Sequence, residues 1–301
     1  MTDQAQTETE DVLRRMPELV CPECCGDLSA DAEGLRCADC GAAYPVREGI
    51  PQLLDGASRA LAHEIAVQDR VALEYENKRY ADPYSRRYHE SWTDYMLAGL
   101  DSSGKVLDNG CGIGFLSDRL PGDRLISLDI SSEMLRLASR RAKNLVLGNS
   151  MSLPLRSSSI DLVVCRSLIH HLQTPGKAMD EIHRVLKPGG QAVFADTNTS
   201  LLSYLPRRLF QGGEHFSEDH ENLTMGKMRA IIEPQLRITS VRYLGFIAYP
   251  LLGFPDLWHP FRFFPAKELS YKLLIGLDEL LARIPLVRTQ GWGLIVKVRK
   301  P

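Results

Sequence analysis

The sequence predicts an α/β protein, in which a doubly wound, mostly parallel sheet of seven strands follows a small N-terminal zinc ribbon. Three observations carry this prediction. Two CxxC pairs lie near the start, a short apolar strand runs into a glycine turn, and strand-like and helix-like segments alternate afterwards. The 301 residues allow one large core and a small satellite, since single cores stop growing at roughly 250 to 300 residues.

The composition bounds the cellular setting and the partners. A formal net charge of −2 gives no overall basic field for non-specific binding to nucleic acid. Residues 1–18 are polar and acidic, which predicts a disordered lead-in and not a signal peptide. The most apolar stretch, 243–258, contains two prolines and an aspartate, so it predicts no membrane span. We therefore expect a cytoplasmic protein.

The first element is a four-cysteine knuckle. Cys21 and Cys24 form one CxxC pair, Cys37 and Cys40 form the other, and residues 25–36 separate them. Two thiolates at positions i and i+3 of a tight turn can share an ion, and two such turns complete a tetrahedral four-sulfur zinc site. The chain has seven cysteines, an odd number that favours metal binding over a disulfide framework. A four-sulfur site has no open coordination position, so the zinc is expected to be structural.

The end of this knuckle, YPVREGIPQLL at 44–54, resembles the zinc ribbon of the small activator protein that partners several tRNA and release-factor methyltransferases. The resemblance covers about residues 19–54, and we place the ribbon at 19–56. Related ribbons are also fused in front of methyltransferase domains. The resemblance implies docking to a protein partner or positioning of a substrate, and it does not imply catalysis.

A glycine turn begins the second unit. The strand expected near 105–109 runs into GCGIG at 110–114, and the pattern at 114–120 predicts a helix. This is the first half of a nucleotide-binding βαβ unit. A dinucleotide fingerprint would have glycine where Phe115 stands, which argues against NAD or FAD. The next strand ends at Asp129, where a carboxylate can accept hydrogen bonds from ribose hydroxyls.

These motifs resemble the class I S-adenosylmethionine-dependent methyltransferases of the type 11-like group, whose first motif is an acidic residue followed by GxGxG. LVLGNSMSLPLRSSSIDLVVCRSLIHHL and EIHRVLKPGGQAVFADT match later family segments, so the resemblance covers most of 70–300. It implies S-adenosylmethionine as cofactor, with the methionine portion near Asp108 and the glycine turn, the ribose on Asp129 and the adenine against Ile130. Asn149 stands where many relatives have an aspartate that accepts from the adenine amino group. The implied cofactor-binding residues are Asp108, Gly110, Cys111, Gly112, Gly114, Asp129, Ile130, Asn149, Ser150 and Arg166.

The remaining elements complete the expected sheet. Strands are predicted near 125–130, 144–149, 160–165 and 190–196, with a further pair near 239–246 and 291–299. Helices are predicted near 132–142 and 175–187. We expect a helical lid or linker at 57–100, the methyltransferase domain at 101–301, a cap insertion at about 201–238 and an apolar C-terminal segment at about 247–290.

The chemistry is expected at the carboxyl ends of the strands. Methyl transfer is an in-line displacement, so the protein aligns the acceptor and handles its proton. His170 and His171 are the candidate bases, and His170 is preferred because relatives often have a substrate-side histidine there. A purely structural histidine, and a reaction that needs no base, stay open as alternatives. Tyr75 or Tyr80 is expected to close over the cofactor, and His215 and His220 are further polar candidates.

Three functions compete. The first is methylation of a small-molecule acceptor, with a quinone, a polyketide, a sugar and a lipid-linked compound as the open alternatives. A hydrophobic or lipid-like acceptor reached at a membrane surface is the sharper hypothesis, because Trp, Phe and Arg occur together within 201–290. An ordinary substrate cap and core helix is the simpler interpretation of that segment. The second is rRNA or tRNA base methylation, since a four-cysteine ribbon ahead of this fold resembles enzymes that methylate a guanine ring nitrogen. The net charge argues against nucleic acid. The third is a non-catalytic scaffold or activator of another methyltransferase.

Overall fold

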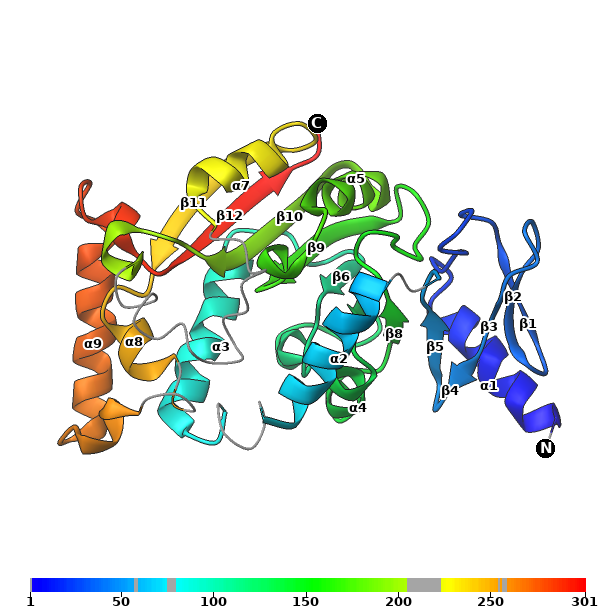
Figure 1. The fold of residues 1–301 in the computed structure, drawn as a ribbon, viewed down its shortest axis with the longest axis horizontal. Coiled ribbons are helices and arrows are strands. Elements are labelled where there is room, and N and C mark those ends of the chain that lie inside the picture. Colours follow the sequence, from blue (N-terminus) through cyan, green and yellow to red (C-terminus); the bar gives the residue numbers. More distant parts are fainter. Residues whose placement is uncertain (1, 57–58, 75–79, 205–222, 254, 256–258) are drawn as a thin grey trace.

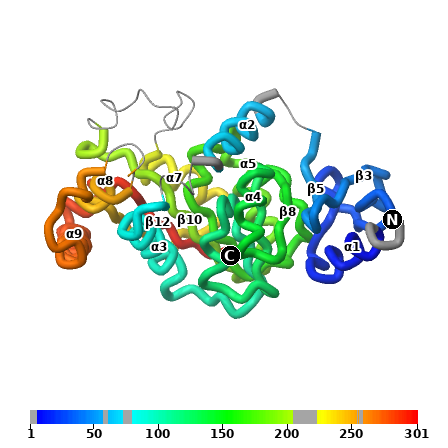
Figure 2. The backbone as a smooth tube through the Cα atoms, turned by 90° about the horizontal axis from the view of Figure 1, so that it is seen from below, coloured from blue at the N-terminus to red at the C-terminus, as the bar shows by residue number. Residues whose placement is uncertain are grey.

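The computed structural model describes residues 2–56, 59–74, 80–204, 223–253, 255 and 259–301. A twisted sheet lies in the middle of the molecule, with the zinc ribbon at one end of the long axis and helix α9 at the other (Figure 1). The view turned by 90° keeps these two regions at opposite ends (Figure 2). The glycine turn and its neighbouring loops lie between them.

The central sheet has nine strands in the order β11-β12-β10-β9-β6-β7-β8-β5-β4. Seven of them match the strands predicted from the sequence: β6 (Val106–Asn109), β7 (Leu125–Asp129), β8 (Leu145–Gly148), β9 (Ile160–Arg166), β10 (Leu186–Thr197), β11 (Arg237–Leu244) and β12 (Gly293–Arg299). The five from β8 to β10 are parallel, and β12 pairs antiparallel with both β10 and β11. All residues of β6, β7 and β8 are buried, as expected for parallel strands covered on both faces.

Helices cover both faces of the sheet and contribute to its two largest apolar cores. One core includes side chains of α5 (Pro175–Val185) and α7 (Met225–Ile232), and the other includes α3 (Pro83–Leu97) and α8 (Ala248–Leu252). The remaining elements of this part are α4 (Ser132–Ala138), α9 (Lys267–Leu281), η2 (Phe115–Asp118), η3 (Ile169–His171), η4 (Pro260–Phe263) and η5 (Arg288–Gln290). The predicted doubly wound architecture is confirmed.

The helix predicted at 114–120 is wrong. A short 3₁₀ turn, η2, stands in its place. Gly114 has a left-handed backbone (φ 82°), which an α-helix does not tolerate, and Pro121 follows closely behind. A Cβ atom on Gly114 would lie 3.2 Å from Cβ of Ala138 in α4, so this glycine permits close packing of the turn.

The ribbon extends the central sheet from seven strands to nine, which the sequence did not predict. Its own sheet contains β1 (Leu28–Asp31), β2 (Gly34–Cys37) and β3 (Ala43–Tyr44), and a hairpin follows with β4 (Val46–Arg47) and β5 (Ile50–Leu53). Strand β5 pairs parallel with β8 through Gln52 opposite Leu147 and Leu53 opposite Gly148. The ribbon is thereby part of the central sheet.

The expectation of a disordered lead-in is wrong as well. Helix α1 spans Thr2–Arg15 and contacts β1 and β2. Thr9, Val12 and Met16 recur at helical spacing and are buried, which orders the segment against the ribbon. Arg15 also donates a 2.8 Å hydrogen bond from Nη1 to the carbonyl of Lys143.

The predicted lid contains two helices, α2 (Arg59–Glu74) and α3. Helix α2 packs on α4, and its Asp69 accepts a 2.5 Å hydrogen bond from the hydroxyl of Ser131, the N-cap of α4. The negative charge of Asp69 thus lies at the positive end of the α4 dipole. Among the described helices, none is long and apolar enough to cross a membrane.

Candidate active site and metal centre

The four cysteines of the two CxxC pairs meet at one point of the ribbon. All four Sγ atoms lie within 4.8 Å of one another, with Cys21 to Cys40 at 3.7 Å and Cys24 to Cys37 at 3.4 Å. Four thiolates around a tetrahedral zinc lie about 3.8 Å apart, given Zn–S bonds of about 2.3 Å. Backbone amides, foremost that of Cys40, lower the pKa of Cys37 to about 7, which favours the thiolate. The donor set fits a structural zinc, and Cys25 is not part of it.

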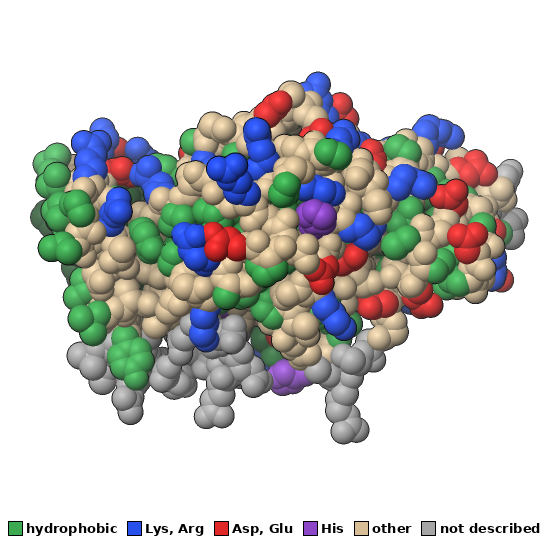
Figure 3. Space-filling view, turned by 90° about the horizontal axis from the view of Figure 1, so that it is seen from above, with side chains coloured by type: hydrophobic (Ala, Val, Ile, Leu, Met, Phe, Trp, Pro, Cys, Tyr) green, Lys and Arg blue, Asp and Glu red, His purple; other side chains and the backbone are tan. Residues whose placement is uncertain are grey.

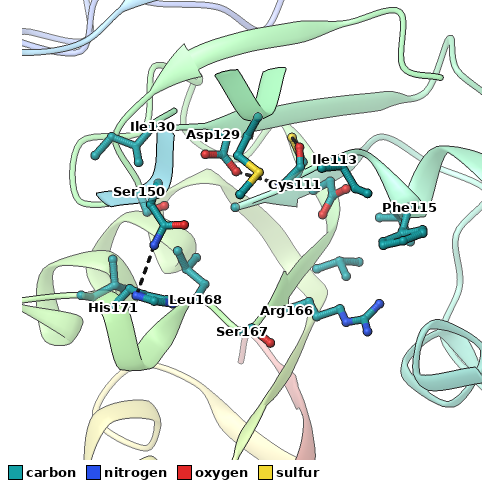
Figure 4. A pocket seen from close by; sticks show the side chains of 18 of the residues that line it. Cys111, Ile113, Phe115, Asp129, Ile130, Ser150, Arg166, Ser167, Leu168 and His171 are labelled. Carbon is teal, nitrogen blue, oxygen red and sulfur yellow. Dashed lines mark hydrogen bonds between the residues drawn. The ribbon is translucent and has the colours of Figure 1, made fainter. Parts of the chain in front are cut away.

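A cleft opens at the carboxyl ends of β6, β7 and β9 (Figure 4). Ten of the twelve residues predicted for cofactor binding or as the base line it: Asp108, Gly110, Cys111, Gly112, Asp129, Ile130, Asn149, Ser150, Arg166 and His171. Asp129 and Cys111 lie on one side, facing Arg166 and His171 on the other (Figure 4). Two predicted residues, Gly114 and His170, are not in its lining.

The glycine turn leaves room for a ligand. Gly110 and Gly112 have left-handed backbones, with φ of 77° and 52°. A Cβ atom on Gly112 would have no heavy atom within 4 Å apart from its chain neighbours, so open space lies beside this backbone. Gly110 is more enclosed, because its Cβ would lie 3.1 Å from Cδ1 of Leu168. The turn therefore brings bare backbone to the cleft.

Asp129 is a buried carboxylate held in a fixed orientation at the end of β7. Its Oδ2 accepts from the amide of Gly112 at 2.8 Å, and its Oδ1 accepts from the amide of Ser131 at 3.0 Å. Burial raises the pKa of Asp129, while these amides act in the opposite direction. Each oxygen retains acceptor capacity toward the cleft, which suits a ligand with hydroxyl donors.

Asp108 and Arg166 give the cleft one acidic and one basic group. Burial, followed by the nearby Asp129, raises the pKa of Asp108 to about 7, and Arg166 opposes this shift. The Arg166 guanidinium donates to Nδ1 of His89 at 3.0 Å and to the hydroxyl of Thr93 at 3.4 Å. It forms no salt bridge with any residue that the structure describes. A carboxylate and a guanidinium in one cleft suit a zwitterionic amino-acid group.

The tautomer of His89 follows from its two contacts. Its Nε2 lies 2.9 Å from the carbonyl of Gly253, which can only accept, so the proton is on Nε2. Nδ1 then accepts from Arg166. The imidazole is neutral in this arrangement, and Arg166 remains the positive group on this side of the cleft.

The two candidate histidines of η3 have different environments. His171 lines the cleft, and its Nδ1 lies 3.3 Å from Oε1 of Glu64 and 3.4 Å from Nε2 of Gln68, both in α2. His170 packs behind it, with Nδ1 at 2.6 Å from Oδ1 of the fully buried Asp196. Burial and the neighbouring His170 lower the pKa of His171, so its imidazole is neutral near pH 7. The sequence-based preference for His170 therefore does not agree with the lining of the cleft.

Asn149 and Ser150 are both held by hydrogen bonds to the protein. The Asn149 side-chain oxygen accepts from the amide of Met151 at 2.9 Å, and its nitrogen donates to Asp55 of the ribbon at 3.2 Å. The Ser150 hydroxyl donates to Oδ1 of Asn109 at 2.7 Å. The ribbon thus orients one wall of the cleft, a contact that the sequence did not predict.

Several lining residues were missed because they belong to helices that precede the glycine turn. They are Glu64, Gln68, His89 and Thr93. Tyr249 of α8, which follows the glycine turn in the sequence, was missed as well. Tyr80 lines the cleft, with its ring edge-on to Phe115 at 4.6 Å. Tyr75, His215 and His220 lie outside the described residues. A helical pattern in sequence gives the buried face, but it does not say that this face borders a cleft.

Comparison with known families agrees with this geometry. Residues 107–194 match the family described as a methyltransferase domain, and residues 17–49 match the family described as Trm112p-like protein. The chain carries a methyltransferase domain preceded by a Trm112p-like ribbon. The resemblances inferred from the glycine turn and the two CxxC pairs are confirmed.

Individual relatives support the methyltransferase domain. A demethylmenaquinone methyltransferase of Lactiplantibacillus plantarum is 32% identical over 158 residues, which cover 47% of this chain and 65% of the relative. The fold matches a possible histamine N-methyltransferase of Thermotoga maritima with a TM-score of 0.55 at 18% identity, over 79% of this chain and 100% of that one. It also matches a complex of the Haloferax volcanii Trm112 activator and a methyltransferase, with a TM-score of 0.52 at 21% identity, over 80% of this chain and 97% of that one.

The relatives do not select an acceptor. The chain spans only 30% to 36% of the length of the first curated relatives that it matches. The names of the matched proteins include quinone, acyl-carrier protein and tRNA methyltransferases. The choice among acceptors therefore depends on the cleft of this chain.

Proposed function

We propose that this methyltransferase domain transfers a methyl group from S-adenosylmethionine to a small, largely apolar acceptor. The observation that carries the proposal is the convergence of Asp108, Asp129 and Arg166 on the open backbone of Gly112. These groups match the charged and hydroxyl groups of the donor one by one. When bound, S-adenosylmethionine supplies a methyl group on a positively charged sulfur, which is already activated for displacement.

Each of these residues would hold a different part of the donor. Asp108 would hold the α-ammonium and Arg166 the α-carboxylate, which pairs each charge with its opposite inside a buried site. Asp129 would accept from the ribose hydroxyls, as its fixed orientation supports. Ile130 offers an apolar contact for the adenine. The buried Cys111 fills space beside these groups.

The remaining wall of the cleft supports an apolar acceptor. Helices α2, α3 and α8 contribute Leu61, Met96 and Tyr249, and the loop after β9 contributes Leu168 and Leu172. Such a wall gains little from a polar acceptor, whereas it stabilises an apolar one by burial. The net charge of −2 also disfavours RNA as the acceptor.

His171 is the proposed proton acceptor, with Glu64 as the residue that orients it. The carboxylate of Glu64 at 3.3 Å and the side-chain nitrogen of Gln68 at 3.4 Å both lie at Nδ1 and orient the ring. The lowered pKa keeps the imidazole neutral and able to accept. His170, on Asp196, fixes the geometry of η3 and does not reach the reacting atoms.

The ribbon is proposed to serve its own methyltransferase domain. Strand β5 is bonded to β8, and the carbonyl of Pro22 accepts from the hydroxyl of Ser152 at 2.7 Å. Asp55 reaches the cleft through Asn149. These contacts support a structural role that includes shaping the donor site, as opposed to a role only in recruiting another protein.

Calorimetric titration of the zinc-loaded chain with S-adenosylmethionine and S-adenosylhomocysteine tests the donor site. Asp129→Ala is expected to weaken both affinities at least about 100-fold, because several charge-assisted hydrogen bonds are lost. Asp123→Ala, at an exposed position before β7, is the matched control and should bind as the wild type does. Wild-type affinity in Asp129→Ala would refute the assignment. A folded wild type that binds neither compound would favour the scaffold function.

His171 is tested by transfer of labelled methyl groups into fractions of a metabolite extract. His171→Gln should slow transfer by roughly 10² to 10⁴ with unchanged donor affinity, as expected for a lost general base. His170→Gln should reduce transfer less and should leave the pH profile in place. Equal rates in wild type and His171→Gln would remove the base from the mechanism. Incorporation into RNA and into no apolar fraction would overturn the proposed acceptor class.

A further inference from the structure

The exposed apolar side chains gather at the end of the molecule that α9 forms. Among the described residues, every large hydrophobic side chain recorded as exposed belongs to 201–204 or 263–286: Leu201, Leu202, Tyr204, Phe263, Leu269, Leu273, Leu277, Leu280, Ile284 and Leu286. Hydrophobic side chains crowd this end in the space-filling view, with Lys and Arg beside them (Figure 3). Such a concentration marks a contact surface.

Helix α9 is apolar on two faces. Tyr271 and Asp278 are buried on its inner side, whereas Leu269, Leu273, Leu277 and Leu280 recur at helical spacing on the outer side. Between 40% and 64% of each of these leucines is exposed. The inner face is accounted for by packing, and the outer stripe is not.

The stripe continues beyond the end of α9. Leu286 is 89% exposed, and the chain at 200–202 lies beside this region in both views (Figures 1 and 2). The hydroxyl of Ser200 donates to the carbonyl of Gln290 at 2.9 Å, and the amide of Leu202 donates to Gln290 Oε1 at 3.4 Å. These bonds add the exposed Leu201 and Leu202 to the same end.

Cations flank the apolar stripe. Helical spacing places Lys272 on one border of the stripe, where its Nζ also lies 3.4 Å from Oε1 of Glu268. A hollow next to the carboxyl end of α9 is lined by four arginines, Arg229, Arg242, Arg283 and Arg288. Arg229 pairs with Glu233 and Arg242 with Glu279, but Arg283 and Arg288 form no salt bridge with a described residue. The hollow therefore offers guanidinium groups to an anion.

We propose that this face docks on an anionic phospholipid membrane. The leucine stripe would lie at the boundary of headgroups and acyl chains, and the arginine hollow would take a lipid phosphate. Apolar side chains in the middle and cations at the border are the arrangement that such an interface stabilises. The inference uses no residue of the donor site and stands independently of the proposed methyl transfer.

A second copy of the chain fits this face less well. Parallel pairing of two α9 helices would bring each flanking cation against itself, and antiparallel pairing would bring Lys272 toward Arg283. Glu268 pairs with both Arg87 and Lys272, and Glu279 pairs with Arg242, so these two carboxylates face three cations and leave no excess negative charge to offset the repulsion. An anionic surface compensates the cations in either orientation of the helix.

The docking face is linked to the cleft by direct packing. Asp278 of α9 accepts from the amides of Phe246, Ile247 and Ala248 at 3.0, 2.7 and 3.2 Å, which fixes the start of α8. Tyr249, the next residue, lines the cleft. A bilayer at this face would lie one packed helix away from the cleft.

Vesicle flotation with the full zinc-loaded chain, without methyl donor, tests the proposal. The wild type should float with phosphatidylcholine vesicles that contain phosphatidylglycerol, and raised salt should weaken this binding. Leu273→Ser with Leu277→Ser should lower the partition coefficient at least about tenfold, from the loss of apolar burial. Arg283→Glu should lower it roughly fivefold or more for anionic vesicles, since each cation near such a surface contributes about 1 kcal/mol. Arg47→Glu, exposed on the ribbon, is the charge-matched control and should float like the wild type.

Three outcomes would overturn the proposal. The wild type could fail to float with anionic vesicles while circular dichroism shows it folded. The leucine and Arg283 variants could float as the wild type does. Sedimentation velocity could show a dimer that the leucine variant abolishes, which would assign the stripe to a second copy. Titration with S-adenosylhomocysteine on the same samples separates these results from a failure of the donor site.

Discussion

The ribbon and α9 lie at opposite ends of the molecule and differ in the burial of their apolar side chains. Val12, Met16, Leu19 and Leu53 of the ribbon end are between 0% and 2% exposed and share a core with the central sheet. In α9 the outer leucines remain in contact with solvent. The ribbon also shares backbone hydrogen bonds with the sheet through Leu53, whereas α9 docks by side chains and by the carboxylate of Asp278.

This contrast separates apolar residues that hold the fold from apolar residues that remain for an external contact. The ribbon has few apolar residues of its own, so it depends on zinc and on the edge of β8. Helix α9 has enough apolar residues for an inner core face and a second face outside. The ribbon, which shares a core with the sheet, is therefore part of the folded domain. Helix α9 has apolar residues beyond those that its own packing needs, and these remain on the surface.

Removal of the zinc ligands should have the largest effect on stability, and this effect should begin at the ribbon end. Cys37→Ser with Cys40→Ser is expected to eliminate zinc, whose binding contributes apparent energies of about 10 to 16 kcal/mol in small zinc domains. The ribbon should unfold and expose the edge of β8, which lowers the melting temperature of the whole chain. Metal analysis and thermal unfolding measure the two effects. Cys25→Ser is the control, because Cys25 is outside the cluster. Full zinc content in the double variant would contradict the assigned ligands.

A pair of leucine substitutions compares the two ends directly. Leu53→Ala should lower the free energy of unfolding by about 2 to 5 kcal/mol, as for other fully buried leucines. Leu273→Ala in α9 should change it by no more than about 0.5 kcal/mol, because its side chain is 64% exposed. Urea unfolding of both variants measures the difference. Equal losses at the two positions would show that the outer face of α9 also stabilises the fold.

The pH dependence of donor binding should come from a residue of the cleft, and substitutions at either end of the molecule should not alter it. Asp108 ionises as pH rises through about 7, and only its carboxylate attracts the α-ammonium of the donor. The affinity should therefore rise with pH toward 7 and level off above it, with at most about a tenfold change per unit below. Calorimetry across this range measures the profile. Asp108→Asn should flatten it, whereas Leu273→Ala should not; a profile unchanged in Asp108→Asn would assign the titration to another group.

The smallest expected effect tests how far the ribbon reaches into the cleft. Asp55→Ala removes the acceptor that fixes the Asn149 nitrogen, so donor affinity should fall a few-fold, in line with one hydrogen bond of about 1 kcal/mol. Zinc content and melting temperature should hardly change. Glu48→Ala, another acidic residue of the ribbon, provides the control. An affinity equal to that of the wild type would limit the role of the ribbon to stability.

Much of the fold and part of the cleft could be predicted because they depend on local patterns. The strands of the sheet are continuous apolar runs, and the glycine turn with Asp108 and Asp129 lies where each strand ends. The lead-in helix was missed because its apolar residues are few and gain their burial only against the ribbon. The preference for His170 rested on the resemblance to relatives. Which of the two adjacent histidines borders the cleft depends on their surroundings, Asp196 beside His170 and Glu64 beside His171, which are distant in sequence.

The sequence by itself determined the cluster of four cysteines, the order along the chain of the seven predicted strands, and the carboxylates and glycines that lie where these strands end. These features follow from residue spacing and from the rule that parallel strands end at one edge of a sheet. Only the tertiary structure decided that β5 joins β8, that Asp55 orients Asn149, and that α9 keeps a leucine stripe outside. The physical reason is that strand pairing at a sheet edge and the exposure of a side chain depend on which distant segments of the chain lie next to it. The local pattern of apolar residues does not specify those neighbours.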